Sequence, residues 1–171
     1  MDDTAGTPES AARSPQRMGK YLRVLGETED AVPVGAASGS SFRVLVVDDD
    51  PATRRLYSIH LALRGFEVLE ASDGRHGLER ARAEAPDLVV TDVMMPGLDG
   101  FELAAALRAD ERTSRIPLIF LSGETAAVNE TRAGELGALA YLRKPLDFGA
   151  FATLVAHMLE GLGPPVPDFA A

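Results

Sequence analysis

The chain has 171 residues, no cysteine and a formal net charge of −9. Without cysteines it can form neither disulfides nor a cysteine-ligated metal site. The acidic balance argues against direct binding to nucleic acid, which depends on neutralising phosphates. No apolar stretch reaches the roughly 18 residues that a membrane helix needs, and the first residues do not resemble a signal peptide. We therefore expect a cytoplasmic protein that does not enter a membrane.

Residues 1–41 are rich in Gly, Ser, Pro, Ala and Thr, which is typical of a disordered or linker-like arm. Within this arm four apolar residues have the spacing i, i+3, i+4 and i+7 of one helix face. They are Met18, Tyr21, Leu22 and Leu25. A helix this short is marginal by itself. Residues 18–25 are thus either an apolar patch in the arm or a docking segment for this domain or for a partner.

From residue 42 onward, short apolar runs alternate with helical patterns. We predict strands at 43–47, 66–70, 87–91, 118–121 and 139–142. Between and after them we predict helices from 51 to about 64, from 74 to 85, from 101 onward, at 125–135 and at 147–159. This alternation predicts an α/β fold, with one parallel sheet and helices on both of its faces. Residues 42–162 would form this domain, and residues 163–171 a C-terminal tail.

The first predicted helix carries three apolar residues at helical spacing. Leu56, Ile59 and Leu63 are predicted to form its inner face. Pro51 suits its first turn, and Asp50 is expected to be its N-terminal cap.

Four of the predicted strands end in polar residues of different chemistry. Asp48 and Asp49 follow the first strand, and Asp92, Ser122 and Lys144 stand at or just after the ends of the third, fourth and fifth strands. The carboxyl ends of parallel strands meet at one edge of the sheet, where ligands bind in open α/β folds. A capping role explains an isolated Asp at a strand end, but it does not explain three that converge.

The three carboxylates need a counter-charge, because two carboxylates 4 Å apart repel each other by roughly 4 kcal/mol at an effective dielectric constant of 20. A divalent cation with oxygen ligands, such as Mg²⁺, suits such a cluster. Such a site favours phosphoryl chemistry, in which a carboxylate can be the nucleophile. Ser122 could then donate a hydrogen bond to a phosphate oxygen and Lys144 could neutralise another. The alternatives are a plain loop hydroxyl for Ser122 and a solvated surface amine for Lys144.

These strand ends resemble the receiver domain of bacterial two-component response regulators, which has the CheY-like fold. The resemblance rests on four motifs in order: VVDDDP at 46–51, TDVMMPGLDG at 91–100, LSG at 121–123 and KP at 144–145. It covers about residues 42–162. It implies a flavodoxin-like (βα)₅ doubly wound sheet of five parallel strands in the order 2-1-3-4-5.

The resemblance also implies roles for the acidic residues. Asp92 would accept a phosphoryl group from a histidine kinase or a histidine phosphotransfer protein. Asp49 and Asp92 would bind Mg²⁺, or Mn²⁺, together with the backbone carbonyl of Met94. Asp48 would reach the metal mainly through water.

Further roles follow from the family pattern. Ser122 would be the switch hydroxyl, Gly123 would leave room for the phosphodonor, and Lys144 would bind the phosphate. A cis peptide bond is expected before Pro145. Tyr141 matches the switch aromatic, which is expected to swing inward on activation. The alternative for Tyr141 is a half-exposed strand residue without a switching role.

Two positions are expected to tune hydrolysis of the aspartyl phosphate. They are Met94 and Glu124, each two residues beyond a site residue. Because a methionine side chain hydrogen-bonds an attacking water poorly, we expect a longer-lived phosphoryl group than in relatives with Asn or Gln at position 94.

The resemblance predicts a signalling phosphoacceptor rather than an enzyme, with only self-catalysed phosphotransfer and slow loss of its own phosphoryl group. Its output would be a change in protein–protein contacts through the face formed by the fourth helix, the fifth strand and the last helix. Because few residues follow the last helix, we expect either a stand-alone receiver with an N-terminal extension or a fragment of a longer protein. The kinase and the target are not identified, and homodimerisation stays open.

Two other functions compete with this one. The VVDDD run also resembles the first motif of haloacid-dehalogenase-type phosphatases, with Asp48 as nucleophile and Asp50 as acid. That family needs a further acidic pair after the lysine, and it would leave Asp92 without a role. The other alternative is a receiver-shaped interaction module that is never phosphorylated.

Overall fold

The structure, a computed structural model, describes residues 42–123 and 127–161. Its strands are β1 (Arg43–Val47), β2 (Glu67–Ala71), β3 (Leu88–Asp92), β4 (Leu118–Ser122) and β5 (Ala140–Arg143). Its helices are α2 (Pro51–Leu63), α3 (Gly74–Glu84), α4 (Gly100–Ala109), α5 (Ala127–Glu135) and α6 (Phe148–Glu160). All ten predicted elements are present, with ends within about two residues of the prediction. The segment 18–25 and Glu124 lie outside the described residues.

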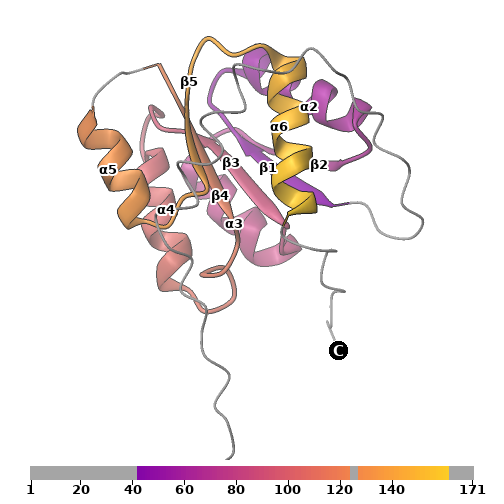
Figure 1. The fold of residues 1–171 in the computed structure, drawn as a ribbon. Coiled ribbons are helices and arrows are strands. Elements are labelled where there is room, and N and C mark those ends of the chain that lie inside the picture. Colours follow the sequence, from indigo (N-terminus) through magenta and orange to yellow (C-terminus); the bar gives the residue numbers. More distant parts are fainter. Residues whose placement is uncertain (1–41, 124–126, 162–171) are drawn as a thin grey trace, which may run out of the picture.

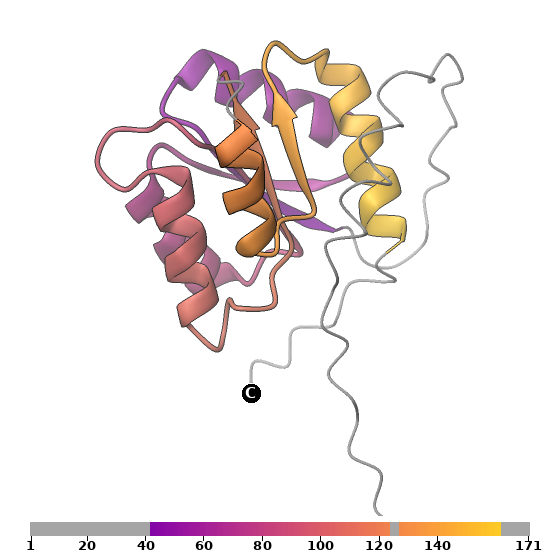
Figure 2. The same ribbon diagram turned by 60° about the vertical axis from the view of Figure 1, so that its left-hand side comes forward.

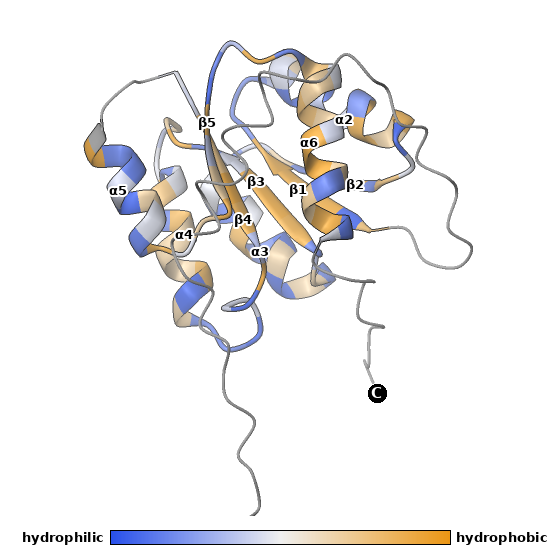
Figure 3. Cartoon of the chain, in the orientation of Figure 1, coloured by the Kyte–Doolittle hydropathy of each residue, from blue (hydrophilic) through white to orange (hydrophobic). Residues whose placement is uncertain are grey.

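The five strands form one parallel sheet in the order β2-β1-β3-β4-β5, which confirms the predicted topology. Helices α2 and α6 cover one face of the sheet, and α3, α4 and α5 cover the other (Figures 1 and 2). The strands are the most apolar part of the molecule because both of their faces are buried (Figure 3). Two apolar layers result, one beneath each group of helices.

Aspartate side chains start four of the helices. Each accepts hydrogen bonds from backbone N–H groups of the first turn, which would otherwise lack a partner. These caps are Asp50, Asp73, Asp99 and Asp147. The predicted capping role of Asp50 is therefore confirmed, and this separates Asp50 from the two aspartates that precede it.

The predicted inner face of the first helix is wrong. Leu56, Ile59 and Leu63 of α2 are 42%, 40% and 76% exposed, whereas the buried residues of this helix include Tyr57 and Leu61. Both sets have helical spacing, so the sequence pattern alone does not choose between them. The choice depends on α6, because the ring of Tyr57 packs 4.9 Å from two phenylalanine rings of that helix.

Candidate functional site

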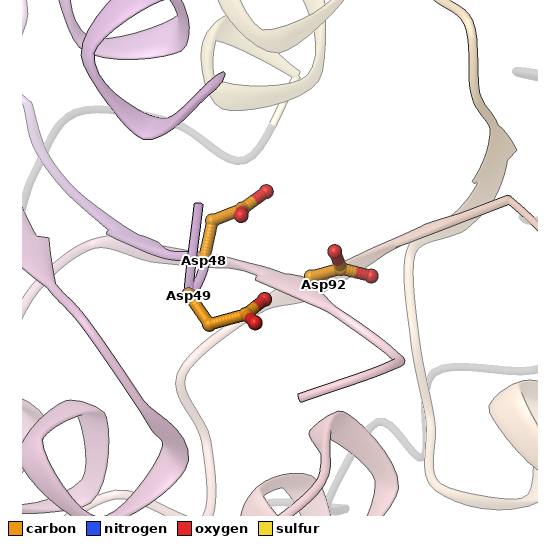
Figure 4. A group of neighbouring side chains, drawn as sticks. All are labelled: Asp48, Asp49 and Asp92. Atoms are coloured by element: carbon orange, nitrogen blue, oxygen red, sulfur yellow. The ribbon is translucent and has the colours of Figure 1, made fainter. Parts of the chain in front are cut away.

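The three predicted acidic residues meet at the carboxyl edge of the sheet. Asp48 and Asp49 follow β1 and Asp92 ends β3, and these two strands are hydrogen-bonded neighbours. One carboxylate oxygen from each of the three residues lies within 4.8 Å of the other two, and Figure 4 shows the side chains of Asp48 and Asp49 extending toward Asp92. Asp48 and Asp92 are buried while Asp49 is exposed, so this acidic cluster opens to solvent on the Asp49 side.

Lys144, just beyond β5, bridges two members of the acidic cluster. Its Nζ donates to Asp92 Oδ2 at 2.7 Å and to Asp48 Oδ2 at 3.0 Å. Burial by itself would lower the pKa of Lys144, but the hydrogen bonds to Asp92 and Asp48 outweigh it and raise this pKa. The ammonium group is therefore charged at neutral pH and offsets part of the charge of the cluster. The Lys144–Pro145 peptide bond is cis, as the resemblance predicts.

Asp48 is held on several sides. Its Oδ1 accepts a hydrogen bond from the N–H of Asp50 at 2.9 Å, and its own N–H donates to the Ala71 carbonyl at 3.2 Å. Burial raises the pKa of the Asp48 carboxyl above its ordinary 3.8, although hydrogen bonds from Lys144 and Asp50 oppose this shift. Asp48 is thus a fixed, largely dehydrated member of the cluster.

Arg54 is a site residue that the sequence reasoning missed. From the second turn of α2 its Nη1 donates to the Asp48 carbonyl oxygen at 2.6 Å, while its Nε lies 3.4 Å from a carboxylate oxygen of Glu70 on β2. The guanidinium group therefore ties the turn that carries Asp48 and Asp49 to the edge strand. The only signal in the sequence is an arginine one helical turn after the capping Asp50.

Asp92 sits in a tightly packed loop. Its Oδ1 accepts a hydrogen bond from the N–H of Met94 at 3.1 Å. A Cβ atom on Gly100 would lie 2.2 Å from the Asp92 carbonyl oxygen, far inside van der Waals contact. Only glycine allows the start of α4 to approach the backbone of Asp92 this closely. The sequence analysis did not predict this contact.

Ser122 is the last residue of β4, the strand that pairs with β3 and its Asp92, and it is fully buried. The carbonyl oxygen of Ser122 accepts a hydrogen bond from the N–H of Lys144 at 2.7 Å. The next residue, Gly123, is exposed, and a Cβ there would meet no atom of the described residues within 4 Å. Met94, two residues after Asp92, is 58% exposed.

Tyr141 of β5 is only 3% exposed, so the half-exposed position in the alternative is wrong. The ring already lies inside the domain in this structure, whereas the predicted inward swing on activation would start from an outward position. Its ring lies 6.4 Å from that of Phe120 on β4. Its hydroxyl group is buried and has no hydrogen-bond partner in the part of the chain that the structure describes. A buried hydroxyl group without a hydrogen-bond partner lowers the stability of the fold, so this position of the Tyr141 side chain is not an optimal one.

The chemistry of the acidic cluster suits a divalent metal ion. Three carboxylates supply hard oxygen ligands, and the buried pair, Asp48 and Asp92, share a single ammonium group, that of Lys144, in this structure. Mg²⁺ is commonly held by one or two carboxylates together with waters and phosphate oxygens. The exposed carboxylate of Asp49 leaves one side of the cluster open to such ligands.

A parallel sheet in this order with an acidic carboxyl edge defines a domain of the CheY-like class. Comparisons with known proteins agree: a sequence model of the response regulator receiver domain matches residues 44–156. Chemotaxis protein CheY4 of Vibrio cholerae superposes with a TM-score of 0.65 at 30% identity, covering 69% of this chain and 98% of that one. The chain belongs to the response regulator receiver domain family of two-component systems.

The chain covers nearly all of some curated relatives and only part of others. It is 35% identical over 119 residues to Protein PilH of Pseudomonas aeruginosa, covering 70% of this chain and 98% of PilH. It is 41% identical over 118 residues to the DNA-binding dual master transcriptional regulator RpaA of Synechocystis, covering 69% of this chain and 49% of RpaA. It thus spans about half or less of several relatives, including 24% of the response regulator PleD of Caulobacter vibrioides. In the ranges described, no helix is long and apolar enough to cross a membrane.

Proposed function

We propose that this receiver accepts a phosphoryl group on Asp92 from a histidine kinase or a histidine phosphotransfer protein. The observation that carries the proposal is the bridge from Lys144 to Asp92 and Asp48 within the acidic cluster. Asp92 is the better nucleophile because its side chain is 11% exposed, against 1% for Asp48.

In this proposal an oxygen of Asp92 attacks the phosphorus atom of a phosphohistidine. The P–N bond breaks, and its electron pair stays on the imidazole nitrogen. Asp49, Asp92 and the carbonyl of Met94 would hold Mg²⁺, or Mn²⁺ in its place, with Asp48 acting through water. The metal, when bound, would neutralise charge on the transferring group.

The remaining residues would bind the phosphoryl group and report its presence. Lys144 would leave Asp48 and pair with a phosphate oxygen, and Ser122 would donate a hydrogen bond to another. Movement of Ser122 would be coupled to Tyr141, whose buried hydroxyl supports a second position for its ring. The face formed by α5, β5 and α6 would then change its affinity for a target protein in the cytoplasm, or for a second copy of this chain.

A phosphatase of the haloacid dehalogenase type is the weaker candidate. It would need Asp48 as nucleophile, yet the side chain of Asp48 is only 1% exposed, against 11% for Asp92, and its backbone carbonyl is held by Arg54. It would also leave Asp92 without a chemical role. We therefore propose a phosphoacceptor without turnover of external phosphate esters.

Incubation with acetyl phosphate and Mg²⁺, followed by mass mapping, tests the assignment. We expect one phosphoryl group on the peptide that contains Asp92, and none in an Asp92→Asn variant or without metal. Label on Asp48 would instead favour the phosphatase. A wild-type chain that stays unlabelled with metal and phosphodonor, and that binds no beryllofluoride, would indicate an interaction module that is not phosphorylated.

A further inference from the structure

An apolar stripe runs along the outer side of α2. Among the described residues, five large apolar side chains are exposed, and three of them lie on this one helix face. We call Leu56, Ile59 and Leu63 the α2 stripe. Their spacing of three and four residues places them in one row about 10 Å long. Figure 3 shows apolar colouring on this helix, which lies at the outside of the molecule beside α6.

The domain itself does not use the α2 stripe. The opposite side of the helix makes the contacts with the sheet and with α6, through Tyr57 and Leu61. The exposed Arg55 beside the stripe pairs with Glu70 of β2, 3.3 Å away. A row of apolar side chains that the fold leaves in water indicates a binding surface.

The N-terminal arm joins the domain at the foot of this helix. The carbonyl of Phe42 accepts a hydrogen bond from the N–H of Glu67 at 3.0 Å, and Glu67 lies four residues after Leu63. The arm is therefore attached next to the most exposed member of the α2 stripe. Sixteen residues separate Leu25 from Phe42. A chain of that length has an average reach of about 22 Å, roughly twice the length of the stripe.

The arm contains one segment whose chemistry complements this surface. Residues 18–25 carry four apolar residues at the spacing of one helix face, a row about as long as the α2 stripe. Residues 51–64 contain three arginines and no acidic residue, so charge does not contribute to this match. The segment therefore complements the α2 stripe in apolar spacing and in length.

We propose that residues 18–25 dock on the α2 stripe of the same chain. The row Met18, Tyr21, Leu22 and Leu25 would pack against Leu56, Ile59 and Leu63. A short helix gains little stability alone, so this contact depends on the tether. Tethering supplies an effective concentration in the millimolar range, enough to hold a contact that would be weak between separate molecules. Any partner that binds α2 would then have to displace the segment.

The face formed by α5, β5 and α6 is a poorer site for the same segment. Among its described residues, Val128 is the only exposed large apolar side chain, and Tyr141 is buried. A single apolar side chain cannot match a row of four.

The absence of cysteine allows a direct test on the full chain. A nitroxide label on a Val24→Cys variant, inside the segment but not in its apolar row, should broaden the amide signals of residues 56–63 in the NMR spectrum. A label on a Ser10→Cys variant, outside residues 18–25, is the matched control and should broaden them much less. Substituting Ile59→Gln together with Leu63→Gln should remove the effect without lowering the melting temperature, because both side chains are exposed. Val128→Gln should leave it intact.

Three results would overturn the proposal. The first is no selective broadening of α2. The second is broadening of β5 and α6 instead. The third is broadening of α2 in an isotope-labelled chain mixed with a separate nitroxide-labelled chain, which would show that a second copy occupies the stripe. None of these outcomes bears on phosphorylation of Asp92, so this test is separate from that of the proposed function.

Discussion

Replacing Lys144 by methionine should destabilise the fold through the acidic cluster. The ammonium group is bonded to Asp92 at 2.7 Å and to Asp48 at 3.0 Å, and the side chain of Asp48 is only 1% exposed. Methionine keeps most of the side-chain volume but removes the charge. The variant thus leaves two buried carboxylates facing each other without the cation that bridges them.

The size of the effect follows from this geometry. Removing one partner of a buried ion pair costs about 3–5 kcal/mol, because the remaining charge stays buried. Lys144 is 23% exposed, which weakens the interaction and favours the lower limit, about 3 kcal/mol. Since a domain of this size loses about 4 °C in melting temperature per kcal/mol, we expect a decrease of roughly 12 °C.

Urea denaturation and thermal melting at pH 7 measure this loss. Arg143→Met is the matched control, because Arg143 precedes Lys144 in sequence but is exposed. We expect the control to change the free energy of unfolding by less than about 0.5 kcal/mol. Equal losses in the two variants would refute the reasoning.

The pH dependence provides an independent check. The pKa of Lys144 is raised above its ordinary 10.5 in the folded state, so its contribution is complete below that pH and is lost as the pH rises through the folded pKa. Burial already raises the pKa of Asp48 above 3.8, and losing the Lys144 bond should raise it further. The folded variant then takes up a proton more readily than the unfolded chain as the pH falls toward the raised pKa of Asp48. The stability deficit of the variant relative to the wild type should therefore shrink on acidification from neutral pH, and a deficit independent of pH would contradict this expectation.

Three further variants test other parts of the site. Gly100→Ala should lower the free energy of unfolding by about 3 kcal/mol, because its Cβ would lie 2.2 Å from a backbone oxygen, whereas Gly123→Ala should cost less than about 0.5 kcal/mol in urea denaturation. Arg54→Met should weaken Mg²⁺ binding several-fold in calorimetric titration, while Arg55→Met, which does not touch the acidic turn, should leave it unchanged. Met94→Asn should shorten the lifetime of the phosphoryl group several-fold, as followed by mass spectrometry, because asparagine can hydrogen-bond the attacking water. Unchanged Mg²⁺ binding in Arg54→Met would count against a role of Arg54 at the metal site. An unchanged phosphoryl lifetime in Met94→Asn would count against a role of Met94 in hydrolysis.

Much of the fold and of the site was accessible from sequence because the signals are local. Strands of four or five apolar residues, aspartate caps and glycine or proline stops are patterns of neighbouring residues. They located all ten elements and therefore also the strand ends. Once the strands are parallel, their carboxyl ends share one edge, and the strand order implied by the family resemblance puts β1 beside β3, which brings Asp48 and Asp49 close to Asp92.

The features that the sequence did not determine depend on contacts between distant segments. The Arg54 bond to the Asp48 carbonyl and the close approach of Gly100 to the backbone of Asp92 are set by how helices dock on the sheet. Two apolar rows of α2 have the same helical period, and only packing against α6 decided that Tyr57 and Leu61 face inward. Periodicity determines that a helix has an apolar face, but the neighbouring elements determine which row is buried. In this protein the sequence by itself determined the order of the elements along the chain and the acidic residues at the carboxyl ends of the strands. Only the tertiary structure determined that Lys144 links Asp48 to Asp92 and that Leu56, Ile59 and Leu63 of α2 remain exposed.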